Sequence, residues 1–532
     1  MMTRTAGQHG SGAARVAQTA TALVLGLAVA AGCQDVPSRA ETSLPQLQWR
    51  DNCAPIARPA PLSLDAARDA YRSAQRRQEL RLREAAAPGA LMREIQARFD
   101  EGTAPAFGNL CLSDFAELGE RLFEHEFHYA DGLGGGAAAR ARKGPFRRVH
   151  EGLFGGPETI SCPSCHWVGG PNGAGAETDN AFLSGDGAQP GSGDARNPNA
   201  LVALGVVQAL ASEMSEDLQQ QRDALQRDAR STGEPREQRL SSKGVDFGTL
   251  RVAANGEIDT SAIDGVDADL VVKPFGWKGT RPDIASFSTE ALQVHLGIQG
   301  DDLIEAGPGD FAGRGPDPLD LDGDGVKAEF GRSAIAALTV HLALLEMPIV
   351  EPLIQDQPLE PAASGLLPPT TTSFVEDFAR GRERFHALGC AGCHRPMLLL
   401  KSPILRADGL PPTDLAREMR RPELKYDPML EGYPVWLFSD LRRHDMGKAN
   451  TARHLQRGVG PGEYLTPRLW GVADSAPYLH DGRAPSFDYA IAGHDGEGTA
   501  ARAAYAALPQ EEKGALRVYL MSLRRASRVM IP

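Results

Sequence analysis

Apolar side chains recur at helical spacing in two stretches that share one step. In the segment SFVEDFARGRERFHALG, Phe378 and Phe385 lie on one face of a predicted helix, with Gly381 between them. The segment SDFAELGERLFEHEF repeats the step from glycine to phenylalanine, Gly119 to Phe123. Either segment alone fits an amphipathic core helix, but the shared step predicts two related helical units.

Another amphipathic helix is predicted at 509–524. It opens with Pro509 and two glutamates and ends in arginines, which is the charge order that helix ends prefer. We expect it to pack against the helix at 378–388. Between the two helical units, the segment 351–373 holds five prolines and a run of threonines, which is typical of an extended linker.

The middle of the chain is less regular. The charged segment Ser215–Gly244 predicts a solvated helix followed by a loop, and Phe247–Val252 and Asp269–Phe275 predict short strands. The pattern as a whole therefore predicts a mainly α fold with a few short strands and long loops.

Two C-x-x-C-H motifs, CPSCH at 162–166 and CAGCH at 390–394, carry the clearest chemistry. Two thiols at this spacing can add to the vinyl groups of a haem while the adjacent imidazole binds the iron. A thioredoxin-like pair or half a zinc site would not need the histidine after each second cysteine. The motifs predict two covalently bound c-type haems, each in a cytochrome c-type domain. The predicted haem-binding residues are Cys162, Cys165 and His166 for the first haem and Cys390, Cys393 and His394 for the second.

The N-terminal region predicts export. Arg4 and Arg15 precede the apolar stretch Thr21–Ala31, which is long enough for a signal peptide and too short to cross a bilayer of about 30 Å. The following AAGC resembles a bacterial lipobox, so Cys33 is a candidate for lipidation and membrane anchoring. An ordinary signal peptide cleaved nearby is the alternative. Both place the protein in the periplasm or, as a lipoprotein, at the outer membrane.

The remaining cysteines and the net charge narrow the picture. Cys53 and Cys111 are left as a pair in an oxidising compartment, which predicts a disulfide. The formal net charge of −13 argues against nucleic acid as a partner.

These features predict five parts of the chain. They are a signal peptide with lipobox at 1–33, a helical extension at 34–105, an N-terminal haem domain at 106–350, a Pro-rich linker at 351–373, and a C-terminal haem domain at 374–532.

A half-motif for calcium lies in the first predicted haem domain. Asp320, Asp322 and Asp324 fit the D-x-D-x-D-G start of an EF-hand loop. The acid due at loop position twelve is replaced by Gly331, although Glu329 stands nearby. An Asp/Gly-rich turn without calcium explains the same residues.

The motifs FSDLRRHDMG at 438–447 and YLTPRLWGVADSAPYLHDGRAPSFDYAIAGHDGE at 464–497 resemble the bacterial dihaem cytochrome c peroxidase superfamily, most closely its dihaem oxidoreductase branch. RNPNALVALGV at 196–206 and GWKG at 276–279 extend the resemblance towards the N-terminus. Cytochrome c domains place a helix just before the haem, with a small residue where another helix crosses it.

The resemblance implies a closed electron-relay haem in the C-terminal domain. Its second axial ligand lies fourteen residues after His480, where relatives carry Met or Tyr and this chain has His494. A bis-His, low-spin iron at His394 and His494 is therefore predicted, with Arg483 as a partner for a haem propionate. If His494 is instead a surface residue, Met446 is the reserve ligand.

For the haem of His166 the resemblance implies the reactive site. Trp277 matches the tryptophan that carries electrons between the haems, and His295 stands where relatives have an acid that handles peroxide protons. His295 has three readings: a general acid/base, a ligand that closes the iron site, or an ordinary helix residue. Three earlier histidines are further candidate distal ligands or solvated loop residues: His125, His128 and His150.

The function expected from the resemblance is peroxidase-like. An electron donor, such as a small redox protein, would reduce hydrogen peroxide or a related oxidant through the two haems. The alternatives are a non-catalytic dihaem electron carrier and an oxidase of an organic or protein substrate.

Overall fold

The computed structural model describes 111–134, 149–151, 157–186, 188–300, 329–348, 374–419 and 424–525, together with single residues at 49, 53, 75, 79, 90, 91 and 94. The predicted signal peptide with Cys33, the calcium half-motif at Asp320, Asp322 and Asp324, and the linker at 351–373 lie outside the described residues. The domain boundaries therefore stay predictions.

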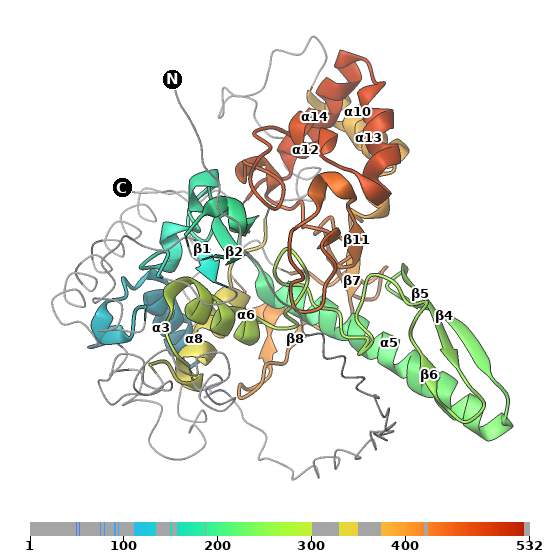
Figure 1. The fold of residues 1–532 in the computed structure, drawn as a ribbon, viewed down its shortest axis with the longest axis horizontal. Helices are drawn as coiled ribbons and strands as arrows, with labels where there is room; N and C mark the ends of the chain where they lie inside the picture. The colour runs from blue at the N-terminus through green and yellow to red at the C-terminus, as the bar shows by residue number, and fades with distance from the viewer. Residues whose placement is uncertain are drawn as a thin grey trace, which may run out of the picture. The chain divides into compact units, whose positions relative to one another are not determined.

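Two helix pairs build the frame around the cysteine motifs (Figure 1). Helix α3 (Leu112–Glu124) packs on α8 (Arg332–Ala343), and α10 (Phe374–Ala387) packs on α14 (Gln510–Ser522). The predicted pairing of the last helix with the helix before the second motif is thus confirmed. In each pair the sequence signal was an apolar face that only a partner helix could cover.

Both pairs cross at the glycine that the repeat singled out. A β-carbon on Gly119 would lie 2.0 Å from the carbonyl oxygen of Ala337, and one on Gly381 would lie 2.1 Å from that of Ala515. Neither position has room for a side chain, because the partner backbone occupies the space. The shared glycine step therefore marks the same helix crossing twice.

The long helix α5 (Leu204–Thr232) contacts α8 and has a buried first part and a charged second part. It packs along the strand β4 (Arg236–Ser242), as Figure 1 shows. Four shorter helices complete the set that the structure describes: α6 (Ile284–Ala291), α11 (Leu415–Glu418), α12 (Phe487–Ala492) and α13 (Thr499–Ala506).

The strands of the described residues form five small sheets. The two three-stranded sheets have the orders β1-β2-β3 and β4-β5-β6, and the two-stranded sheets are β10-β7, β11-β12 and β8-β9. All pairs are antiparallel except β1 with β2. The other strand bounds are β1 (Val149–Glu151), β2 (Ala181–Gly185), β3 (Asp194–Arg196), β5 (Val245–Val252), β6 (Ile258–Asp259), β7 (Leu398–Leu400), β8 (Ile404–Leu405), β9 (Thr413–Asp414), β10 (Tyr433–Val435), β11 (Arg443–Asp445) and β12 (Glu463–Leu465).

The prediction of a mainly α fold was wrong, because strands pair throughout the segments between the helices. Most of these strands have only two or three residues, too few for an alternation of apolar and polar positions to be read. The strand predicted at Phe247–Val252 is confirmed as part of β5, but Asp269–Phe275 forms no strand. The loop predicted after the charged helix contains β4 instead.

Segments near the two cysteine motifs contact each other directly. The Asn197 backbone N–H donates to the His480 carbonyl at 2.7 Å, and the Asn180 amide donates to the Asp481 carbonyl at 2.7 Å. The predicted disulfide between Cys53 and Cys111 is present. Across the described residues, no helix is both long enough and apolar enough to span a membrane.

Candidate functional site: two haem cavities that share a tryptophan

The first motif begins with a 3₁₀ turn at Cys162–Ser164, and Cys162, Cys165 and His166 all line one cavity. The Nδ1 atom of His166 lies 3.2 Å from the carbonyl oxygen of Gly173. That carbonyl can only accept, so Nδ1 carries the proton and Nε2 keeps its lone pair for a metal. Burial lowers the pKa of His166 to about 4, which keeps the imidazole neutral as an iron ligand requires.

The second motif repeats this arrangement. Its 3₁₀ turn is Cys390–Gly392, and the Nδ1 of His394 lies 3.3 Å from the carbonyl oxygen of Phe438. Burial, reinforced by His494, lowers the pKa of His394 to about 4. Both motifs therefore present two thiols and one neutral Nε2 to a cavity, which is the donor set that a c-type haem needs. The residues of the second motif that line its cavity are Cys390, Cys393 and His394.

The predicted sixth ligand of the second haem is well placed. His494 donates its Nδ1 proton to the carbonyl of Ala490 at 2.9 Å, and burial lowers its pKa, so its Nε2 is also free for iron. The rings of His394 and His494 have centroids 6.2 Å apart. Two imidazoles on opposite sides of one iron, with bonds of about 2 Å, would place their centroids roughly 6 Å apart. The pair fits a bis-His haem.

The two cavities meet at Trp277. They have volumes of about 190 Å³ around His166 and about 310 Å³ around His394, and Trp277 lines both. Its indole N–H donates to the carbonyl of Asn197 at 2.7 Å, which fixes the ring. Gly276 precedes it with φ of 78°, a left-handed conformation that glycine adopts without strain.

His295 lines the first cavity together with His166. It belongs to a π-helical turn, Leu292–Leu296, that continues α6 and ends at Gly297. Such turns are rare and often lie at functional sites, because the extra residue redirects a side chain. The turn brings His295 against Glu158, four residues before the first motif, where Nδ1 of the imidazole contacts the carboxylate.

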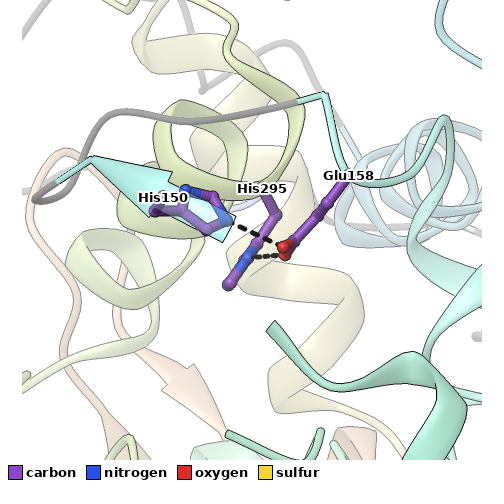
Figure 2. Close-up of side chains that lie close together, drawn as sticks. All are labelled: His150, Glu158 and His295. Atoms are coloured by element: carbon purple, nitrogen blue, oxygen red, sulfur yellow. Dashed lines mark hydrogen bonds and ion pairs between the residues drawn. The ribbon is translucent and has the colours of Figure 1, made fainter. Parts of the chain in front are cut away.

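Glu158 also accepts a hydrogen bond from His150, so one carboxylate lies between two imidazoles (Figure 2). Burial by itself would raise the pKa of Glu158, but the charge and hydrogen bonds of His295 and His150 lower it to about 2. Burial would likewise lower the pKa of His295, yet Glu158, with Glu290 beyond it, raises it above its ordinary value. The site thus pairs an ionised carboxylate with an imidazole that holds its proton more tightly than usual.

Sequence reasoning missed two arginines that line the second cavity, Arg468 and Arg502, and Arg502 is paired with Asp495. The side-chain hydrogen bond seen for Arg468 goes to the carbonyl of Ala200 at 3.3 Å, and burial is the cause of its shifted pKa. Burial alone lowers this pKa to about 10, and no acid among the described residues offsets that effect. Arg483, the predicted propionate partner, lines neither cavity and pairs with Asp481 at 2.7 Å.

The hydroxyl of Tyr464 also faces this cavity. It is buried and has no hydrogen-bond partner among the described residues. A buried hydroxyl without a partner costs free energy, so it indicates a polar group that is supplied from outside the chain. A haem propionate would satisfy both this hydroxyl and the guanidinium of Arg468.

His444 and Met446 lie at the edge of the second cavity. The two ring nitrogens of His444 contact carboxylates, Asp440 and Glu497, each at 2.8 Å, and Nδ1 also lies 3.8 Å from the sulfur of Cys393. Burial would lower the pKa of His444, but the hydrogen bond and charge of Asp440 favour the protonated ring. Met446 lines the same cavity as His394 and His494 and stays the reserve ligand.

Of the three early histidines, none is among the residues that line the first cavity. His125 is buried and bonds Asp131 at 3.1 Å, and His150 reaches the site through Glu158 and through an edge contact with the ring of His295, with centroids 6.0 Å apart. Sequence reasoning missed Glu158 because its partner His295 is 137 residues away. Its one local signal was an acid shortly before a cysteine motif.

Comparison with known proteins adds one match. The family described as di-haem oxidoreductase, putative peroxidase, matches residues 367–523, which include the second motif and His494. Among curated proteins, none matches the chain.

Proposed function

Residues 367–523 match the family described as di-haem oxidoreductase, putative peroxidase, and from this match we propose that the chain is an exported dihaem c-type peroxidase. It reduces hydrogen peroxide at the haem of His166, using electrons relayed by the haem of His394. The donor is a small redox protein in the periplasm, where Cys33 anchors the enzyme to a membrane.

The observation that carries the proposal is the pair of cavities that share Trp277. Each cavity has a C-x-x-C-H motif whose histidine keeps Nε2 free. In the second cavity His394 and His494 lie at a spacing at which both would bind one iron, and a haem held in this way would suit electron relay. In the first cavity His295 lines the wall together with His166, and its Nδ1 contacts a carboxylate and not a carbonyl.

The reaction consumes two electrons and two protons for each hydrogen peroxide and yields two waters. The haems, when bound, supply the iron at which the oxygen–oxygen bond breaks and the electrons to reduce it. Trp277 offers the aromatic step between the cavities. His295 takes a proton from peroxide at Nε2 and returns one to the leaving oxygen, which is general acid/base catalysis.

The test is electron paramagnetic resonance of the ferric dihaem protein with peroxide turnover. We expect one low-spin signal from the bis-His haem and one high-spin signal that disappears on cyanide binding. Two low-spin haems that persist after one-electron reduction, with no peroxide turnover, would leave a non-catalytic electron carrier as the function.

A Trp277→Phe variant tests the route between the haems. We expect both haems to be retained and peroxide turnover to fall by roughly tenfold or more, because phenylalanine lacks the indole ring that would pass electrons between the haems. Rapid mixing of the half-reduced protein with peroxide measures this directly, and an unchanged rate would remove Trp277 from the path.

A further inference from the structure

Three side chains beside the first haem cavity form a chain of hydrogen bonds (Figure 2). His150 lies on β1, Glu158 precedes the first motif, and His295 lies on the π-helical turn. The Nε2 of His150 lies 2.8 Å from one oxygen of Glu158, and the Nδ1 of His295 contacts the other oxygen. The Glu158 backbone N–H also donates to the His295 carbonyl at 3.0 Å, so the two residues are held together twice.

The burial of these groups fixes where the protons are. His150 is fully buried, and the side chain of Glu158 is 6% exposed. A carboxylate can only accept a hydrogen bond, so Nε2 of His150 donates its proton to Glu158. The positive charge that balances Glu158 falls on His295 when that ring is protonated.

This arrangement also decides which nitrogen of His295 is available. Nδ1 faces Glu158, so Nε2 is the atom left for the cavity that His295 shares with His166. Four charged or titratable groups surround His295. Glu158 and His150 belong to the same set of hydrogen bonds, Glu290 lies on α6, and His166 lines the same cavity. Glu290 is already paired with two arginines, Arg281 and Arg457.

We propose that Glu158, held in place by His150, is the positioning residue that points Nε2 of His295 at the haem cavity and supplies the counter-charge when Nε2 takes a proton. The inference rests on the proposed acid/base role of His295. Relatives carry an acid at the position of His295. In this chain the carboxylate belongs to Glu158 instead, and the imidazole of His295 lies between it and the cavity. The same order, carboxylate then imidazole then reacting group, orients histidine bases in serine hydrolases.

The proton inventory is simple. An incoming acid such as hydrogen peroxide or hydrogen cyanide gives its proton to Nε2 of His295, while Nδ1 keeps the proton shared with Glu158. Glu158 stays ionised throughout. At low pH His295 is already protonated at Nε2 and cannot accept a proton from the incoming acid. The rate therefore falls as the pH is lowered.

The test uses the full-length ferric dihaem protein and the pH dependence, between pH 5 and 9, of cyanide association and of kcat/KM for peroxide. We call the fall in rate at low pH the acid limb. In the wild type we expect the midpoint of this limb above pH 6.5, because Glu158 favours the protonated ring of His295. In Glu158→Gln this limb moves to lower pH by about one unit or more, and the plateau falls. Glu158→Asp, which keeps the charge, returns the limb towards higher pH and covers the case in which Glu158→Gln folds poorly.

Two matched variants sharpen the reading. Asp179→Asn removes another carboxylate from the same cavity without touching His295, and it should leave the limb where it is. His295→Gln should abolish the limb.

The failures are distinguishable. If His295→Gln abolishes the limb but Glu158→Gln does not move it, the positioning role is wrong while the peroxidase function stands. If the wild type binds no cyanide and turns over no peroxide, the proposed function fails as well. One non-haem metal per chain, lost in His150→Ala, would also overturn the proposal, because the three groups would then be metal ligands.

Discussion

The two haem regions are built alike and differ in the contacts of the second histidine that lines each cavity. In both, a glycine lets two helices cross, a 3₁₀ turn carries the cysteines, and a backbone carbonyl orients the histidine. Opposite His394 stands His494, whose Nδ1 proton goes to a carbonyl. In the cavity of the first motif lies His295, whose Nδ1 faces the carboxylate of Glu158.

The partner of Nδ1 sets the protonation preference of each histidine, so two similar helix pairs can hold histidines with different chemistry. A carbonyl partner leaves an imidazole neutral and ready to bind iron, as for His494, whose pKa is lowered by burial. A carboxylate partner favours the protonated ring, as for His295, whose pKa is raised against the effect of burial. The first kind of histidine would suit a ligand of a relay haem, and the second would suit the acid/base role that we propose for His295.

The largest effect is expected from His494→Met, which replaces the proposed second iron ligand of the C-terminal haem. Thioether donates less to ferric iron than imidazole, so the reduction potential of the C-terminal haem should rise by on the order of 0.1 V. Spectroelectrochemistry measures this, with Met446→Leu as the control that should change nothing. An unchanged spectrum in His494→Met would make Met446 the ligand to test next.

Adding a methyl group at the helix crossings tests whether the two frames are equivalent. Gly381→Ala and Gly119→Ala place a β-carbon against a carbonyl oxygen, so each should reduce the free energy of unfolding by about 1 to 3 kcal/mol. Gly514→Ala, on α14 with open space around it, should instead stabilise by about 0.5 to 1 kcal/mol. Thermal unfolding of the haem-loaded protein checks all three, and a neutral Gly119→Ala would show that the first crossing is looser.

The smallest effect concerns the charge in the second cavity. Arg468→Gln removes a buried cation near the haem of His394 and should lower that haem's reduction potential by on the order of 50 mV. Arg483→Gln is the matched control, since Arg483 is already paired with Asp481 outside both cavities. A larger shift in the control would restore Arg483 as the propionate partner.

Local patterns predicted those parts of the fold whose signal lies within one helix or turn. The helices around Phe378 and Phe123, and the final helix, follow from apolar spacing over about three turns. The small sheets could not be predicted, because pairs such as β8 with β9 depend on residues brought together by the rest of the fold. Asp269–Phe275 had strand-forming residues but found no partner strand.

The two cysteine motifs were predicted from spacing, because each holds its thiols and histidine within five residues. His494 was predicted from the family resemblance, which places a ligand fourteen residues after His480. Arg468 could not be chosen over Arg483 from sequence, because which arginine enters the cavity depends on packing.

By itself the sequence determined that the chain carries two haem motifs in two related helical units, since covalent spacing and helical periodicity act over a few residues. Only the tertiary structure decided what faces each motif. It set Trp277 between the cavities and brought Glu158 to His295 across 137 positions. The physical reason is that a histidine's proton affinity and the direction of its free nitrogen are set by its neighbours in space, which one residue's place in the chain does not specify.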